Sequence, residues 1–130
     1  MYFFIDGYNF LFWLSQQKGS LKEQRRDLII WLKDVFTYQH LKGIVIFDGS
    51  HRSNEESGLA YSSPLDIAYA PKELNADAYI QEKLITCKQR HLCVVVTDDR
   101  SLRKQIRDLG AQVESNAAFL KKSFKKEKNF

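Results

Sequence analysis

Short apolar runs alternate with amphipathic stretches along most of the chain. Each run is only three to five residues long, which is typical of a buried strand and too short for a helix. Predicted strands occupy residues 2–5, 44–47, 65–69, 92–96 and 111–113. The apolar residues within a run follow one another instead of alternating with polar ones, which indicates strands that are covered on both faces.

Between these runs, apolar residues recur every three or four positions, the period of an amphipathic helix. Predicted helices cover residues 21–36, 76–87 and 102–109 and begin again at residue 116. Asn75 is the expected N-cap of the second helix, and Gly110 is expected to close the third. The Asp6-Gly7 and Asp48-Gly49 pairs are typical of turns, and residues 50–63 are polar enough to predict an irregular loop.

The order of these elements predicts an α/β fold. Strands and helices alternate, and parallel strands joined by helices form a sheet with helices on both faces. No repeat, low-complexity tract or Pro/Gly-rich linker interrupts the 130 residues, so we expect one domain.

The amino-acid composition indicates a globular protein without a membrane segment. The sequence is 44% hydrophobic and 28% charged, which is typical of a globular domain and not of a disordered chain. No apolar run approaches the roughly 20 residues of a membrane helix, and the first ten residues resemble a strand more than a signal peptide. Cys87 and Cys93 are expected to be reduced core residues. We therefore expect a cytoplasmic protein with no membrane segment.

The formal charge of +4 comes from one end of the chain. Residues 121–130 contain five lysines and one glutamate, and the other 120 residues carry equal numbers of acidic and basic side chains. A cationic extension favours binding to a polyanion such as RNA. The alternative is a solvated helix end that only aids solubility.

Aspartates follow three of the predicted strands: Asp6, Asp48 and the Asp98-Asp99 pair. A fourth, Asp77, lies in the first turn of the helix that leads to the strand before Asp98. In an open parallel sheet, ligands bind beyond the carboxyl ends of the strands, where the strand order reverses. Crowded carboxylates repel one another, and a hard divalent cation such as Mg²⁺ or Mn²⁺ relieves that repulsion. Such a site suits phosphodiester hydrolysis.

Each aspartate also has an ordinary structural explanation. Asp6 and Asp48 precede glycines, as turn residues do. Asp98 or Asp99 is a suitable cap for the helix that follows, and Asp77 complements a helix dipole. Only their joint position at one sheet edge favours the metal-site interpretation.

Four segments resemble the NYN domain, in the YacP-like branch of the PIN nuclease superfamily. They are YFFIDGYNFL at 2–11, VIFDG at 45–49, APKELNADAYI at 70–80 and VVVTDDRSLRKQIRDLGAQV at 94–113, in the order that the family shows. The resemblance implies a three-layer α/β/α, PIN-like fold over residues 1–120, followed by a basic tail at 121–130. It also implies a metal-dependent endoribonuclease, since members of this family cleave RNA, some of them on ribosome-associated mRNA.

The motifs of the family imply site residues. Asp6, Asp77 and Asp99 match its metal-binding acids, and Asp98 becomes an additional ligand or a residue behind the ligands. Asn9 matches the asparagine of the family's first motif, for which we expect a role in RNA binding. Where relatives often have a second acid after Asp77, this chain has Ala78.

Further candidates come from their place near the expected crevice. Arg52, Lys72, Arg100 and Arg103 lie on loops or helix starts and are suited to phosphates. The main alternative function is a non-catalytic RNA- or ribosome-binding module, which Ala78 makes credible. A phosphatase or receiver-like domain also gathers aspartates, but it requires a lysine at a strand end that this sequence lacks.

Overall fold

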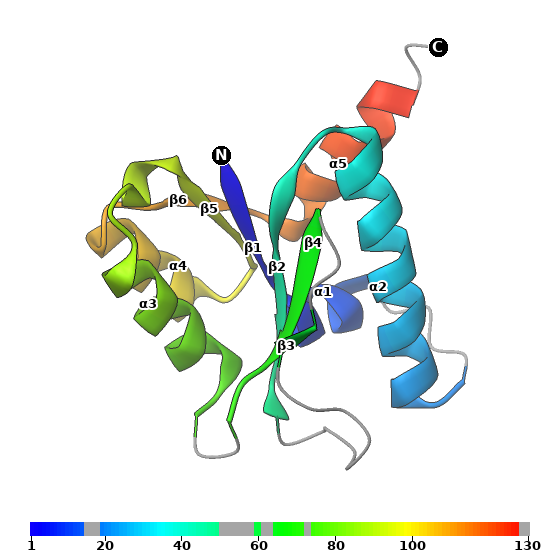
Figure 1. The fold of residues 1–130 in the computed structure, drawn as a ribbon, viewed down its shortest axis with the longest axis horizontal. Coiled ribbons are helices and arrows are strands. Elements are labelled where there is room, and N and C mark those ends of the chain that lie inside the picture. Colours follow the sequence, from blue (N-terminus) through cyan, green and yellow to red (C-terminus); the bar gives the residue numbers. More distant parts are fainter. Residues whose placement is uncertain (15–18, 50–58, 61–63, 72–73, 128–130) are drawn as a thin grey trace.

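The computed structural model describes residues 1–14, 19–49, 59–60, 64–71 and 74–127. Helices and strands alternate along the chain much as the sequence predicts (Figure 1). In order, they are β1 (Tyr2–Asp6), α1 (Gly7–Leu14), α2 (Leu21–Tyr38), β2 (Lys42–Phe47), β3 (Leu59–Ala60), β4 (Leu65–Tyr69), α3 (Ala76–Thr86), the short 3₁₀ helix η2 (Arg90–Leu92), β5 (Cys93–Val96), α4 (Arg100–Asp108), β6 (Gln112–Glu114) and α5 (Asn116–Glu127).

The strands form one sheet in the order β3-β4-β2-β1-β5-β6. All pairs are parallel except β3 with β4, which is antiparallel. Helices α3 and α4 lie on one face, and α1, α2 and α5 lie on the other (Figure 1). The predicted three-layer α/β fold is therefore confirmed. The strand order reverses at β1, which pairs with β2 on one side and β5 on the other.

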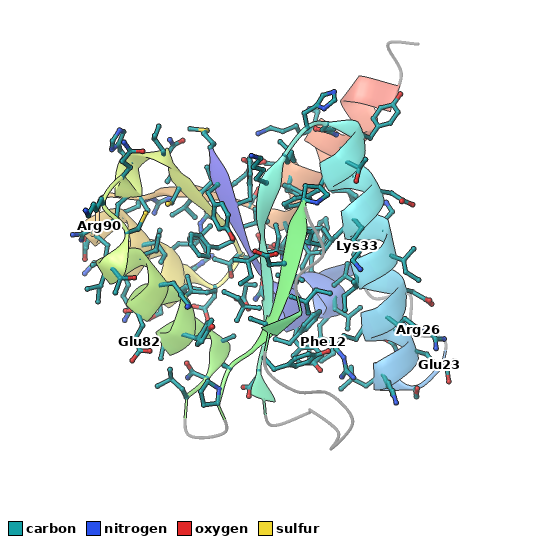
Figure 2. The ribbon with its side chains drawn as sticks, in the orientation of Figure 1. Phe12, Glu23, Arg26, Lys33, Glu82 and Arg90 are labelled. Atoms are coloured by element: carbon teal, nitrogen blue, oxygen red, sulfur yellow. The ribbon has the colours of Figure 1, made fainter. Side chains whose placement is uncertain are left out.

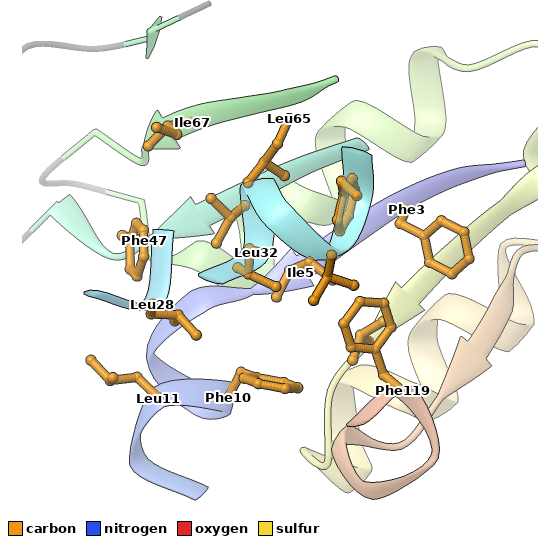
Figure 3. Packing of buried hydrophobic residues seen from close by; sticks show 14 of the residues in the cluster. Phe3, Ile5, Phe10, Leu11, Leu28, Leu32, Phe47, Leu65, Ile67 and Phe119 are labelled. Atoms are coloured by element: carbon orange, nitrogen blue, oxygen red, sulfur yellow. The ribbon is translucent and has the colours of Figure 1, made fainter. Parts of the chain in front are cut away.

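Consecutive residues of each central strand belong to different hydrophobic cores. Phe3 and Ile5 pack under α1, α2 and α5, whereas Phe4 packs under α3 and α4. The first core is rich in aromatic rings, and Phe119 of α5 lies there beside Phe3 (Figure 3). Burial on both faces explains why these strands show no polar alternation in the sequence.

Helix α1 was not predicted. The Asp6-Gly7 pair was expected to form a turn, but β1 continues directly into α1 at Gly7. A Cβ atom at this position would lie 2.5 Å from Cδ1 of Phe47 and 2.9 Å from the carbonyl oxygen of Ile46. Glycine is therefore required by the close approach of β2 and not by a turn.

Residue 25 on α2 also differs from expectation. An arginine in an amphipathic helix is expected to face solvent, yet the side chain of Arg25 is only 2% exposed. Its Nη1 donates a hydrogen bond to the Tyr8 hydroxyl at 2.8 Å, and its guanidinium lies 5.5 Å from the centre of the Tyr69 ring. A buried charge needs such partners.

Helix α5 runs beyond residue 120, as far as Glu127. The expected boundary after residue 120 falls inside α5, and Ser123 is buried. Lys122 donates to Glu114 at 3.2 Å. Within the expected loop at 50–63, only β3 belongs to the described residues.

Cys87 and Cys93 are both free, with their sulfur atoms 3.5 Å apart, and Cys93 is buried. Burial, reinforced by Cys87, raises the pKa of the Cys93 thiol to about 11. Among the helices described, none combines the length and apolar character needed to cross a bilayer.

The tight contact at Gly7 yields a stability prediction. Gly7→Ala should lower the free energy of unfolding by about 1–3 kcal/mol, because the new methyl group would displace the Phe47 ring or β2. Urea denaturation measures the change. Since alanine ordinarily stabilises a helix relative to glycine, a variant as stable as the parent would contradict the steric argument.

Candidate functional site

A cleft of about 280 Å³ opens at the carboxyl ends of the central strands. It lies where the strand order reverses, as expected for an open parallel sheet. Strands β1, β2 and β5 and the first turns of α1 and α3 supply its walls. The residues that line it are Asp6, Tyr8, Asn9, Asp48, Asn75, Ala76, Asp77 and Asp99. Three of the four predicted metal ligands thus share one cleft, and Asp48 joins them.

Asp6 ends β1 and is the most enclosed of these acids, with 6% of its surface exposed. Its Oδ2 accepts a hydrogen bond from the Thr97 hydroxyl at 2.9 Å. Burial raises the pKa of Asp6 to about 7, and the carboxylates of Asp77 and Asp99 add to this rise. The Thr97 bond opposes the shift without cancelling it. The neutral and ionised forms of Asp6 are therefore both accessible near neutral pH in the metal-free protein.

Asp99 serves two purposes. Its Oδ1 accepts from the Leu102 amide at 3.1 Å and so caps α4, as the structural explanation predicts. The same side chain also lines the cleft. Capping α4 and facing the cleft are therefore compatible for Asp99.

Asp77 lies in the first turn of α3, which begins after the predicted N-cap Asn75. Asn75 Oδ1 accepts from the Ala78 amide at 2.8 Å, so the asparagine caps the helix and leaves Asp77 facing the cleft. Burial raises the pKa of Asp77, and the negative charges of Asp99 and Asp48 raise it further. Asp99 and Asp48 are therefore close enough to disfavour the ionised form of Asp77.

Asp98 is not brought to the cleft with the other acids. Its Oδ1 accepts a hydrogen bond from the Asn116 amide at 3.0 Å, at the start of α5. Asn9 lines the cleft, and its Oδ1 accepts from the Asp98 amide at 3.0 Å and from Nδ2 of Asn116 at 2.9 Å. Both residues thus hold the β5–α4 connection against α1 and α5. For Asn9, an additional contact to RNA stays a prediction.

The predicted phosphate-binding residues do not line the cleft where they are described. Arg100 is exposed at the first position of α4, and Arg103 is half-buried one turn later. Arg52 and Lys72 lie outside the described residues. Their contacts to RNA stay predictions.

Two buried polar residues of the site were missed by sequence reasoning. Thr97 donates to Asp6 and accepts from the Asp99 amide at 3.2 Å, so it joins the ends of β1 and β5. Asn116 is fully buried beneath the β5–α4 connection. A polar residue directly after a buried strand was the available signal for Thr97, whereas no local pattern pointed to Asn116.

The lining is chemically suited to a hard cation but is not a ready-made metal site. Carboxylate and amide oxygens are the donors that Mg²⁺ and Mn²⁺ prefer. Mutual repulsion of the carboxylates contributes to the raised pKa values of Asp6 and Asp77, and a divalent cation would relieve it. In the described part of the chain, however, no three His, Cys, Asp or Glu side chains are arranged to hold a metal ion as they stand. The donor set fits, and its side chains have to draw together.

The raised pKa of Asp6 predicts how stability depends on pH. A carboxyl whose pKa is raised from 3.8 to about 7 binds its proton more tightly in the folded than in the unfolded state. The contribution of Asp6 to the free energy of unfolding of the metal-free protein should therefore be largest below about pH 4. It should be lost as the pH rises to about 7. Asp6→Asn should abolish the loss and be more stable at pH 8, by on the order of 3–4 kcal/mol.

Unfolding in EDTA at several pH values tests this dependence. Asp34→Asn, an exposed site on α2, is the matched control and should retain the parent's profile. If the free energy of unfolding of Asp6→Asn changed with pH as that of the parent does, ionisation of Asp6 would not destabilise the folded state.

Comparisons with known proteins identify the fold and the family. Two crystal structures of Rae1 (YacP) from Bacillus subtilis, one of them a point mutant, superpose with TM-scores of 0.78 and, for the mutant, 0.76. Each is 20% identical in sequence; they cover 99% and 98% of this chain, and 76% and 77% of Rae1. No curated protein sequence matches the chain. The model of the YacP-like NYN domain matches residues 3–130. The chain therefore belongs to the family of YacP-like NYN domains.

Proposed function

We propose that this protein is a metal-dependent endoribonuclease that hydrolyses RNA phosphodiester bonds. The observation that carries the proposal is the convergence of Asp6, Asp48, Asp77 and Asp99 on one cleft. Burial raises the pKa values of Asp6 and Asp77, and the neighbouring carboxylates raise them further, as expected where acids share an enclosed site. Membership of the NYN family supports a nuclease-like role that involves RNA.

Asp6, Asp77 and Asp99 would hold Mg²⁺ or Mn²⁺. When bound, the cation supplies Lewis-acid stabilisation of the phosphoryl and leaving oxygens. Thr97 fixes the Asp6 carboxylate through Oδ2, and the α4 cap fixes Asp99 through Oδ1. Each of these side chains thus presents its other oxygen from a defined position. Asp48, at the end of β2, is suited to orient the attacking water.

Asp98 has a positioning role in this proposal. Through Asn116 and Asn9 it holds the connection from which Asp99 projects. Arg100 and Arg103, together with Arg52 and Lys72, are proposed to contact phosphates of the substrate. We further propose mRNA on the ribosome as a substrate, which rests on the family resemblance alone.

One observation favours a second candidate, a non-catalytic RNA- or ribosome-binding module. The described acids are not preassembled around a cation position, and Ala78 stands where relatives often have another acid. A degenerate site of this kind would bind RNA without cleaving it.

Cleavage of labelled RNA with Mn²⁺, or with EDTA in its place, separates the two candidates. Asp6→Asn, Asp77→Asn and Asp99→Asn should each reduce the cleavage rate by more than about a hundredfold, which exceeds the usual effect of outer-shell partners. Asparagine preserves shape and still caps a helix, so the folded state should survive. Circular dichroism provides the check on folding.

Two further variants refine the assignment. Asp34→Asn should cleave at the parent rate, because this exposed residue is on α2 and does not line the cleft. Asp98→Ser should cost less activity than Asp99→Asn, since serine can still accept the Asn116 hydrogen bond. Parent-like cleavage by all three cleft variants would contradict the nuclease proposal and favour the binding module.

A further inference from the structure

Helix α2 separates its charges onto different faces. Lys22, Arg25, Arg26 and Lys33 follow one another at helical spacing, which places them on a single face. The acids Glu23, Asp27 and Asp34 share another face at the same period, and all three are exposed. Residues 1–120 carry equal numbers of acidic and basic side chains, so the cationic face results from where the charges are placed and not from an excess of positive charge.

The cationic face borders a groove of about 260 Å³ between α2 and β4. All four cations line this groove, together with Ile29 and Tyr69. Arg26 and Lys33 lie along α2, with Lys33 on the side of β4 (Figure 2). The distance along the helix axis from Lys22 to Lys33, eleven residues later, is about 16 Å, a length suited to several phosphates of one strand.

The groove meets the acidic cleft at one pair of side chains. Tyr8 lines the cleft, Arg25 lines the groove, and Arg25 Nη1 donates to the Tyr8 hydroxyl at 2.8 Å. Arg25 also lies over Tyr69 on the groove wall. The linings of the two hollows therefore meet at this pair of side chains.

An exposed aromatic ring marks this junction. Phe12 of α1 is stacked on Tyr8, with ring centres 5.5 Å apart and an interplanar angle of 16°. Nearly half of Phe12, 47%, remains exposed. Folding gains little from leaving a large apolar ring in water, whereas such a ring offers a surface on which a base can stack.

We propose that the α2–β4 groove is a binding site for single-stranded RNA that extends from the cleft. Lys22, Arg26 and Lys33 contact successive phosphates, and a base stacks on Phe12 where the strand leaves the cleft. A cationic groove combined with an exposed aromatic platform is the arrangement by which proteins bind single strands without sequence preference. The inference deepens the proposed nuclease function, and rests on it for the identity of the ligand. An acidic protein surface would match the charges but not the stacking ring.

Fluorescence anisotropy with a labelled oligouridylate, which forms no stable duplex, tests the proposal. EDTA is present throughout, so binding is measured whether or not the protein cleaves RNA. The triple variant Lys22→Gln/Arg26→Gln/Lys33→Gln should weaken binding by about 10- to 100-fold and reduce the salt slope by about two. Phe12→Leu keeps an apolar contact with Tyr8 but removes the stacking ring, and should weaken binding by about tenfold at an unchanged salt slope.

Matched controls separate the groove from bulk charge. Lys42→Gln/Lys88→Gln/Arg107→Gln removes three exposed cations that do not line the groove, at the start of β2, after α3 and in α4, and should bind RNA within about threefold of the parent. Tyr38→Leu removes an exposed ring at the far end of α2 and should have no effect.

Equal weakening by both triple variants, or parent-like binding by the groove variant, would overturn the proposal. Parent-like binding would assign the groove to another partner, such as an acidic protein surface. Parent-like binding by Phe12→Leu would overturn the proposed stacking of a base on Phe12, and with it the route of the strand over α1. These outcomes are distinct from failure of the nuclease function, which would appear as absent cleavage in Mn²⁺ while the groove variant still loses RNA affinity.

Discussion

The parallel pairing of β1 with β5 is the constraint on which the site depends. Ile5 pairs with Val96, so the next residues along each strand, Asp6 and Thr97, come to lie side by side. That register permits the hydrogen bond from Thr97 to Asp6 and sets Asp99 two residues beyond. A shift of one residue would turn Asp6 toward a different core, because side chains alternate between the faces of a sheet. The register is held by the two hydrophobic cores, to which alternate residues of β1 contribute.

Much of this could be predicted, since periodicity and burial determine which segments become strands and helices. The aspartates could be assigned to one edge because parallel strands end together. What escaped prediction involves contacts between distant parts of the chain. Gly7 was taken for a turn residue because its local sequence permits one, whereas the decisive fact is the proximity of Phe47. Asp98 and Asp99 are adjacent and chemically identical, and different contacts set their directions: Asn116 holds Asp98, and the first turn of α4 holds Asp99.

Arg25 illustrates the same difficulty on a helix. It lies four residues after Leu21 and three before Leu28, within the apolar stripe of α2, yet its charge suggests solvent. Its burial becomes intelligible only with the Tyr8 hydroxyl and the Tyr69 ring in place. The carboxylates of the site show a similar conflict. Burial disfavours the ionised form of Asp6, yet it is the ionised form that could bind a cation in the cleft. Such local conflicts with folding rules are concentrated at functional sites.

The position of Phe119 has a consequence for how the chain folds during its synthesis. Its ring is 1% exposed and lies within 6.2 Å, centre to centre, of the rings of Phe3, Phe10 and Phe36. Residues from the beginning of the sequence thus complete their packing only against one synthesised more than a hundred positions later. During translation, β1 and α1 emerge long before that partner, so the part of their aromatic surface that Phe119 covers stays exposed until α5 leaves the ribosome. Closure of this core is a late event of biosynthesis, and contacts of such large sequence separation slow folding.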